Sequence, residues 1–155
     1  MEWTIKPIGV VRTPYASKSE CPVQGQARPE AKGTVEVDEA YLPALDSIEL
    51  FSHLYLIYVF DRAGAVELRR KPFLDDAAHG LFATRHPCRP NPLGLSIVRL
   101  LGRSGHVLHV AEVDMLDKTP IIDIKPYVPR FDERADATNG WLQKADLSDK
   151  PAGRE

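Results

Sequence analysis

The sequence has few cysteines and no long apolar run. Its 155 residues include two cysteines, Cys21 and Cys88, too few for the disulfide framework of a small secreted domain. No stretch approaches the roughly 18 apolar residues of a membrane span, and the N-terminal MEWTIKPIGVVRTPY lacks a cationic leader followed by an apolar segment. These absences predict a soluble, cytoplasmic protein with free thiols and no membrane contact.

An excess of one charge is also missing. Twenty basic and 22 acidic residues give a net charge of −2, which argues against a protein that coats nucleic acid through bulk electrostatics. A local basic patch on one face remains compatible with this balance. With 43% hydrophobic residues, the chain is long enough for one domain with its own core.

Several catalytic and cofactor motifs are absent. The sequence contains no G-x-G-x-x-G, no G-x-x-x-x-G-K-[ST] and no G-x-S-x-G, so it lacks the dinucleotide fingerprint, the P-loop and the nucleophile elbow. A hydrolase that uses His53 with the aspartates is therefore disfavoured. A metal site at His79, His86 and Cys88 would need a fourth ligand that the spacing does not offer, so we predict no metal.

The sequence does contain six strand-like segments, rich in Val, Ile, Leu, Tyr and Phe and separated by Gly, Pro and Asp. One short helix is predicted at residues 38–44, where Asp38 can cap the first turn and Pro43 ends it. This pattern predicts a mainly β domain, either a sandwich or a closed barrel, and disfavours a doubly wound α/β sheet. The predicted strands are residues 3–11, 33–37, 48–60, 80–84, 95–101 and 107–113.

Two polar segments flank these strands. Residues 17–32 form a loop long enough to be either functional or disordered. Residues 135–155 form a polar tail in which Trp141 and Leu142 are the strong apolar anchors. We therefore expect a domain over residues 1–134 and a peripheral C-terminal segment over residues 135–155.

The stretch RHPCRPNPLGLS, residues 85–96, combines a rigid backbone with polar side chains. Its prolines push Arg89 and Asn91 toward extended conformations, and Gly94 permits a close backbone approach before the next strand. Arg89 can bind an anion or stack on a planar ring, and Asn91 offers a donor and an acceptor. The composition fits equally well a structural turn in which these two side chains bind backbone carbonyls.

The stretch DMLDKTPIIDIKPYVP, residues 114–129, is the second polar and proline-punctuated segment. Asp114, Asp117 and Asp123 could hold hydroxyl groups or an ammonium group, although any single aspartate more often caps a turn. Lys125 and Tyr127 follow closely in the same segment. Together the two stretches are predicted to form two walls of one pocket.

The ordered strings IGVVRTPY, FSHLYLIYVFD, GLFATRHPCRPNPLGLSIVRL and DMLDKTPIIDIKPYVPRFD resemble the TsaA/TrmO-like family over roughly residues 3–132. The resemblance implies a small closed antiparallel β-barrel that binds S-adenosylmethionine without a Rossmann fold, usually as a homodimer. It also implies methylation of the N6 nitrogen of threonylcarbamoyladenosine beside the anticodon of tRNA. Some members carry an additional C-terminal domain, and this chain stops soon after the expected barrel, so the methyl donor is better supported than the acceptor.

The resemblance also implies site residues. For the substrate side, local clustering favours Asn91, Asp123, Lys125 and Tyr127, with His53 as an outsider. Two alternatives stay open: a module that binds S-adenosylmethionine without turnover, and a methyltransferase with a different nucleoside or a small-molecule acceptor. The residues carried over to the cofactor site are Gln24, Gly25, Gln26, Asp61, Arg62, Arg89, Leu100, Asp114, Met115, Leu116 and Asp117.

Overall fold

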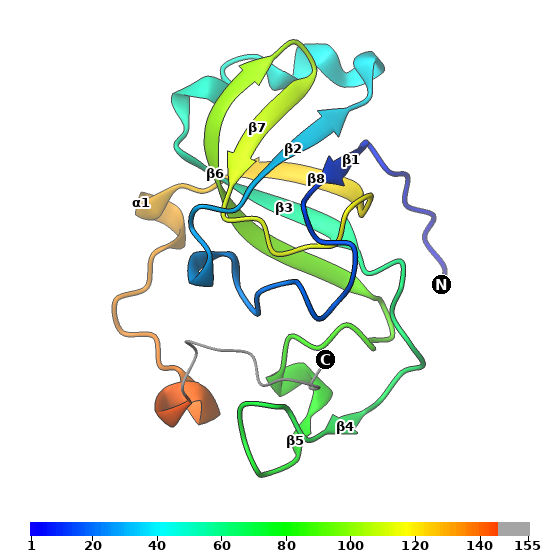
Figure 1. Cartoon of the computed structure of the whole chain (residues 1–155), viewed down its shortest axis with the longest axis vertical. Helices are drawn as coiled ribbons and strands as arrows, with labels where there is room; N and C mark the ends of the chain where they lie inside the picture. The colour runs from blue at the N-terminus through cyan, green and yellow to red at the C-terminus, as the bar shows by residue number, and fades with distance from the viewer. Residues whose placement is uncertain (146–155) are drawn as a thin grey trace.

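The computed structural model describes residues 1–145, and within this range six strands close into an antiparallel β-barrel (Figure 1). The strands follow the order β1-β2-β7-β6-β3-β8, and every neighbouring pair is antiparallel. The prediction of a mainly β domain is confirmed, and the closed barrel is the architecture observed. The barrel strands are β1 (Gly9–Arg12), β2 (Lys32–Val37), β3 (His53–Val59), β6 (Leu93–Ser104), β7 (Val107–Ala111) and β8 (Pro120–Pro126).

The barrel interior is filled by side chains from alternate strand positions. Every second residue of β3 is buried, and β6 buries Gly94, Ser96 and Val98 while the residues between them point outward. Paired residues of antiparallel strands share a face, so the register Leu56↔Ser96 and Tyr58↔Gly94 directs all four residues inward. The largest fully buried side chains are Val11, Val35, Leu54, Leu56, Val98, Leu108, Val110, Val113 and Ile121.

Short helices cover one end of the barrel. The 3₁₀-helices η2 (Glu39–Leu45) and η3 (Ile48–Leu50) lie between β2 and β3, at the top of Figure 1. The helix predicted at residues 38–44 is therefore present as a 3₁₀-helix that continues past Pro43, and Asp38 gives it no side-chain cap. Each 3₁₀ turn is closed by its own hydrogen bond, so the N–H that proline lacks interrupts only one of them.

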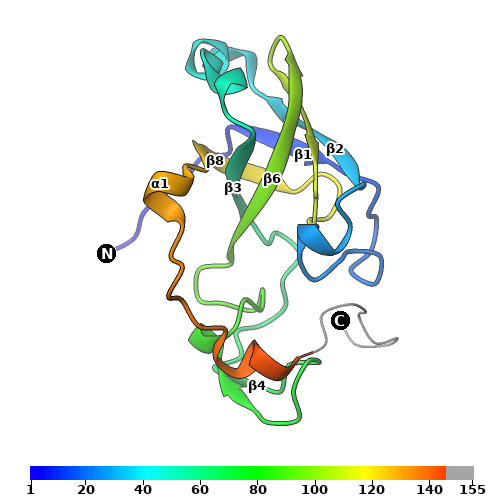
Figure 2. The same ribbon diagram turned by 90° about the vertical axis from the view of Figure 1, so that its left-hand side faces the viewer.

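Residues 61–91 form a lobe at the other end of the barrel, between β3 and β6 (Figures 1 and 2). Its regular elements are the strands β4 (Arg69–Arg70) and β5 (His79–Gly80), which pair with each other, and the 3₁₀-helix η4 (Leu81–Ala83). No helix within residues 1–145 has the length and apolar character to cross a membrane.

The chain returns to this lobe after the barrel. The helix α1 (Pro129–Asp132) leads to the 3₁₀-helix η5 (Gly140–Lys144), which lies against the lobe in Figure 2. Trp141 donates its indole N–H to the carbonyl oxygen of Ala83 at 2.8 Å and stacks on His79 with ring centroids 4.7 Å apart. Residues 146–155 of the predicted tail lie outside the described residues.

Two strand predictions were wrong in part, and one strand was missed. The strand predicted at residues 3–11 begins only at Gly9, because the exposed segment before it has no neighbouring strand. In the stretch 80–84, three apolar residues form η4 instead of a strand, since a single helical turn lets Leu81 reach the interior. The prolines at both ends of β8 concealed a strand that the structure pairs with β1 and β3.

The remaining predicted strands are present with different ends. The segments 33–37, 95–101 and 107–113 correspond to β2, β6 and β7, and β6 is longer than predicted at both ends. The segment 48–60 contains β3, although its first residues belong to η3.

Candidate functional site

The carboxylate of Asp114 joins segments that are distant in the sequence. Its Oδ1 accepts a hydrogen bond from Ser96 Oγ at 2.5 Å, and its Oδ2 accepts one from the backbone N–H of Gly25 at 3.1 Å. Gly25 is the first residue of the 3₁₀-helix η1 (Gly25–Ala27) in the long polar loop. The hydroxyl of Tyr58 lies 3.1 Å from Ser96 Oγ. The carboxylate thus connects this loop directly to β6 and, through Ser96, to Tyr58 on β3, and the charge of Arg85 on the lobe acts on it.

Burial sets the ionisation of this cluster. Desolvation raises the pKa of Asp114 to about 6, while hydrogen bonds from Ser96 and Gly25 and the charge of Arg85 act in the opposite direction. Desolvation also raises the pKa of Tyr58, and the nearby Asp114 charge adds to that shift. At neutral pH the site therefore combines a mostly ionised carboxylate with a protonated phenol.

Gly25 packs where no side chain fits. A Cβ at this position would lie 1.8 Å from the carbonyl oxygen of Glu112. Glu112 itself has a φ of 65°, in the left-handed region that non-glycine residues rarely occupy. This strained turn leads out of β7 toward Asp114, and such strain is concentrated at functional sites.

A second group of contacts holds the segment after β7 next to the start of the lobe. Arg62 donates from Nη2 to the carbonyl oxygen of Asp117 at 2.9 Å and to Thr119 Oγ1 at 3.1 Å, and its Nε lies 3.2 Å from Asp61 Oδ1. The carboxylate of Asp117 accepts a hydrogen bond from the backbone N–H of Thr13 at 3.1 Å. The resemblance implied Asp61 and Arg62 in one segment and Asp117 in another, and Arg62 joins these two segments in the structure.

Arg85 links the lobe to the polar loop. It donates from Nη1 to Gln24 Oε1 at 3.0 Å, and Gln24 and Gln26 are both exposed beside it. The sequence analysis missed Arg85, although it is the first residue of the proline-rich stretch. It also missed Ser96 and Tyr58, and the available signal was their place on the inward-facing positions of apolar strands.

Arg89 and Asn91 have different surroundings. Arg89 donates from Nη1 to the carbonyl oxygens of Leu81, Thr84 and His86 at 3.4, 2.9 and 3.4 Å. These contacts match the structural alternative, in which an arginine ties the turn to its own backbone. The side chain of Asn91 is exposed and forms no hydrogen bond within residues 1–145.

The three remaining substrate-side candidates lie on the outer wall of the barrel. Lys125 pairs in register with the outward-facing Tyr55, and its Nζ lies 2.8 Å from Asp123 Oδ2. The ring of Tyr127 meets Tyr55 edge-on at 5.5 Å. Among residues 1–145, no hydrogen bond, ion pair or ring contact joins this group to Asp114. Within one chain, the structure therefore groups cofactor-side candidates and leaves these three elsewhere.

Four other candidates mainly have packing contacts. Met115 is buried in the core, and Leu116 and Leu100 pack against it. Leu100 lies on β6 roughly 13 Å beyond Ser96 at the usual rise per strand residue. His53 is half-buried on β3, with its Nδ1 2.8 Å from the hydroxyl of Ser52.

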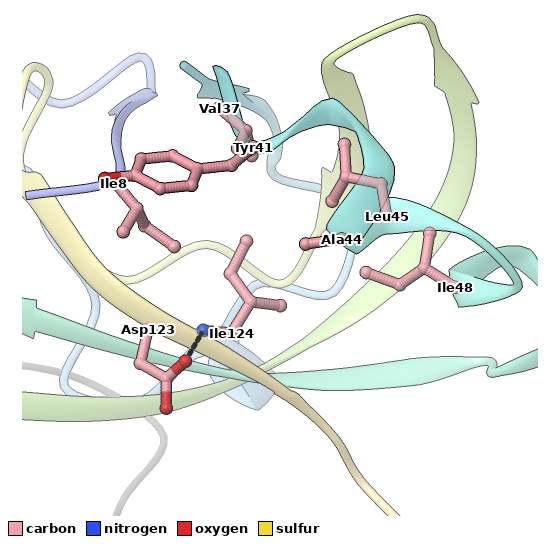
Figure 3. A pocket seen from close by; sticks show the side chains of 8 residues that line it. All are labelled: Ile8, Val37, Tyr41, Ala44, Leu45, Ile48, Asp123 and Ile124. Carbon is pink, nitrogen blue, oxygen red and sulfur yellow. Dashed lines mark hydrogen bonds between the residues drawn. The ribbon is translucent and has the colours of Figure 1, made fainter. Parts of the chain in front are cut away.

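An apolar cavity lies at the opposite end of the barrel, beneath η2 and η3 (Figure 3). Its volume is about 120 Å³, well below the roughly 300 Å³ at which sites for drug-sized ligands begin. Asp123 lies at its margin and accepts a hydrogen bond from the N–H of Ile124 at 2.9 Å (Figure 3). The cavity is lined by Ile8, Val37, Tyr41, Ala44, Leu45, Ile48, Asp123 and Ile124.

The histidines considered as metal ligands have other partners. His79 Nε2 lies 2.7 Å from Asp75 Oδ2, and His86 Nδ1 accepts a hydrogen bond from the backbone N–H of Cys88 at 3.2 Å. In the part of the chain that the structure describes, no group of three or more His, Cys, Asp or Glu residues is arranged to hold a metal ion.

The chain matches a known protein family over most of its length. The family described as the tRNA-methyltransferase O N-terminal domain matches residues 10–133, which include every barrel strand except the first residue of β1. The chain belongs to this family. The family prediction made from the four sequence strings is therefore confirmed.

Curated relatives support the same assignment. A probable S-adenosyl-L-methionine-binding protein of Pyrococcus abyssi is 47% identical over 139 residues, covering 90% of this chain and 76% of the relative. The tRNA (adenine(37)-N6)-methyltransferase of Escherichia coli is 36% identical over 148 residues, covering 89% of this chain and 63% of the enzyme. Among solved structures, TrmO from Pseudomonas aeruginosa superposes with a TM-score of 0.79 at 37% identity, covering 94% of this chain and 63% of that structure. The chain thus spans less than two thirds of these last two proteins.

Proposed function

We propose that this protein is an S-adenosylmethionine-dependent methyltransferase that acts on the N6 nitrogen of adenosine 37 of tRNA, with threonylcarbamoyladenosine as the modified form it accepts. Family membership and the names of its relatives support the methyl donor and the adenosine. The structural observation that carries the proposal is the polar cluster in which Asp114 holds the loop at Gly25 beside Arg85.

The residues of this cluster fit the chemistry of the cofactor. S-adenosylmethionine presents ribose hydroxyls and an α-ammonium group, which need acceptors, and an α-carboxylate, which needs a cation. Asp61 and Asp117 supply carboxylates, Arg62 and Arg85 supply guanidinium groups, and the loop beginning at Gln24 supplies amides. When bound, the cofactor supplies an electrophilic methyl carbon, and these side chains orient it for in-line displacement.

The lobe has the charge and the exposed ring expected of an RNA contact. Its residues 61–91 contain six basic and four acidic side chains, a net charge of +2 against −2 for the whole chain. The ring of Phe82 is 78% exposed, and the guanidinium of Arg89 lies 5.6 Å from its centroid. Unpaired bases stack on such rings, and phosphates bind such cations, so the lobe supports a tRNA acceptor.

A homodimer would complete the substrate side. Four apolar residues of β6 on the outer wall are 39–54% exposed, and their grouping on one strand supports burial against a second copy. The four residues are Leu93, Leu95, Ile97 and Leu101. Asp123 and Lys125 on β8, and Tyr127 after it, are separated from β6 by β3 alone. A dimer interface that spans β6, β3 and β8 would place them against the partner subunit. We propose that Asn91 and the three β8-side residues position the nucleoside in that assembly. We also propose a cytoplasmic location, because two cysteines in 155 residues are too few for the disulfide framework of a small secreted domain.

The deciding experiment uses tRNA from a strain that lacks the endogenous methyltransferase. Purified protein and S-adenosylmethionine are added, the tRNA is digested, and the nucleosides are separated by mass spectrometry. Methylated threonylcarbamoyladenosine is the expected product. A methylated adenosine without the threonylcarbamoyl group would correct the acceptor and keep the activity.

A second candidate is a module that binds S-adenosylmethionine without turnover, as the name of the Pyrococcus abyssi relative suggests for that protein. Calorimetry with the cofactor serves both candidates, and the tRNA digest separates them. Binding without a methylated product would favour the module, whereas failure to bind the cofactor would reject both.

A further inference from the structure

Three polar side chains form a hydrogen-bonded row inside the barrel. The hydroxyl of Tyr58 lies 3.1 Å from Ser96 Oγ, which lies 2.5 Å from Asp114 Oδ1, and the other oxygen of Asp114 accepts the N–H of Gly25 at 3.1 Å. Tyr58 and Ser96 are each only 4% exposed. Burying a hydroxyl in an apolar barrel costs free energy unless it has a hydrogen-bond partner. The hydroxyls of Tyr58 and Ser96 satisfy each other and Asp114, so each depends on the other members of the row.

The ionised carboxylate fixes the direction of every bond in the row. A carboxylate only accepts, so Ser96 must donate its hydroxyl proton to Asp114, and its oxygen then accepts from Tyr58. Both carboxylate oxygens are thereby engaged, one by the barrel wall and one by the loop at Gly25. Ser96 therefore holds Asp114 from the β6 side, and Tyr58 in turn holds Ser96.

A glycine on β6 makes room for the Tyr58 ring. At Gly94, a Cβ would lie 2.2 Å from Tyr58 Cε2, so only glycine lets the Tyr58 ring lie flat against β6. Gly94 and Ser96 are both part of the proline-rich stretch and are adjacent on the inward face of β6. That stretch therefore contributes its glycine and its serine to the interior, in addition to Arg85 toward the loop.

We propose that Tyr58 and Ser96 are positioning residues, which hold the Asp114 carboxylate so that it fixes the loop from Gln24 to Gln26 in its cofactor-binding conformation. This rests on the proposed function for the identity of the ligand, S-adenosylmethionine. The contact from the loop to the carboxylate is a charge-assisted hydrogen bond, roughly twice as strong as a neutral one, so its strength depends on the ionised form of Asp114.

The charges around the row define its pH dependence. Burial raises the pKa of Asp114 to about 6. The hydrogen bonds from Ser96 and Gly25 and the charge of Arg85 on the lobe act to lower this pKa. Tyr58 is faced by Asp114, Arg85 and the thiol of Cys21, and its pKa is raised by burial, so it stays protonated at neutral pH. Cofactor affinity is therefore expected to fall as the pH drops through about 6, and loss of the Ser96 hydroxyl moves that fall to higher pH.

The test measures S-adenosylmethionine affinity by calorimetry between pH 5.5 and 8.5 in the wild type, Ser96→Ala, Ser96→Thr and Tyr58→Phe. We expect Ser96→Ala to lose at least tenfold in affinity at pH 7.5 and to shift the midpoint upward, whereas Ser96→Thr keeps the hydroxyl and restores both. Tyr58→Phe should shift the midpoint in the same direction by a smaller amount. Ser104→Ala, a serine exposed on the same strand, is the matched control.

A second readout needs no cofactor. The backbone amide of Gly25, followed by NMR against pH, should report the titration of Asp114, with a midpoint that rises in Ser96→Ala and returns in Ser96→Thr. A folded Ser96→Ala with wild-type affinity and an unmoved Gly25 midpoint would overturn the positioning role. A wild type that binds no S-adenosylmethionine while its Gly25 midpoint still depends on Ser96 would overturn the proposed function and the ligand assignment, and would leave the role in the loop supported.

Discussion

The two ends of the barrel are built from the same six strands and differ in what fills them. The end under η2 and η3 is closed by apolar side chains around a small cavity, and its stability comes from packing. The end that faces the lobe contains Asp114, Ser96 and Tyr58, where burial opposes the charge of the carboxylate. One end of the barrel is therefore built for packing, and the other, where we propose that S-adenosylmethionine binds, keeps polar groups in the interior.

The largest effect is expected from Gly25→Ala, which breaks the polar end. The new Cβ would lie 1.8 Å from the carbonyl oxygen of Glu112, so the loop must move away from Asp114. We expect S-adenosylmethionine affinity to fall by at least about a hundredfold, or about 3 kcal/mol, measured by calorimetry. The control is Gly80→Ala, since a Cβ there meets nothing within 4 Å. Equal affinities in the two variants would remove the loop from the cofactor site.

Leu45→Ala tests the apolar end. Leu45 is buried and lines the existing cavity, so truncation enlarges a space that the surrounding side chains do not fill. The free energy of unfolding should fall by about 2 to 4 kcal/mol in a urea titration, with cofactor affinity unchanged. Leu50→Ala, at a position 82% exposed on the adjacent η3, should cost far less. Loss of affinity in a folded Leu45→Ala would mean that the two ends are coupled.

Asp114→Asn should separate stability from binding through pH. The folded pKa of about 6 lies above the unfolded value of about 3.9, so the stability that Asp114 contributes is present below pH 4 and is lost as the pH rises through about 6. At pH 7.5 the asparagine removes the cost of burying a charge. Relative to the wild type, its free energy of unfolding should then be higher by about 1 to 3 kcal/mol, while cofactor affinity falls.

The measurement for Asp114→Asn is the difference in unfolding free energy between variant and wild type at each pH from 4 to 8. Taking the difference cancels the contributions of other carboxylates such as Glu20 and Asp75, whose lowered pKa values make stability rise with pH. A difference that stays constant across this range would contradict an ionised, buried Asp114.

The smallest effect on stability is expected from Lys125→Ala on the outer wall. The exposed ion pair with Asp123 contributes less than about 0.5 kcal/mol to the free energy of unfolding. S-adenosylmethionine affinity should stay unchanged, because no hydrogen bond, ion pair or ring contact within residues 1–145 joins Lys125 to Asp114. The KM for tRNA should rise if the residue meets substrate across a dimer. Lys6→Ala, an exposed lysine before β1, is the control. An unchanged KM would contradict a substrate role for Lys125 and leave its ion pair with Asp123 as its one assigned contact within residues 1–145.

Strand content and family were accessible from the sequence because alternation and ordered motifs are local properties. The strand β3 alternates regularly, and the pattern revealed it even though its first residue was misplaced. By contrast, β8 was hidden by prolines, and it became a strand only because β1 and β3 lie on either side of it. The roles of Asp123 and Lys125 were inferred from nearness in sequence to Asp114, yet the outward register of β8 directs them to another surface.

By itself, the sequence determined the β class, the family and the rigid stretch that ends in Gly94 and Ser96. Only the tertiary structure decided which end of the barrel is polar and which partners each side chain has. Barrel closure sets the register between strands, and register decides whether a side chain meets the core, the loop or solvent. No local sequence signal marks Ser96 as a buried donor to Asp114, because its two hydrogen-bond partners lie 18 and 38 residues away along the chain.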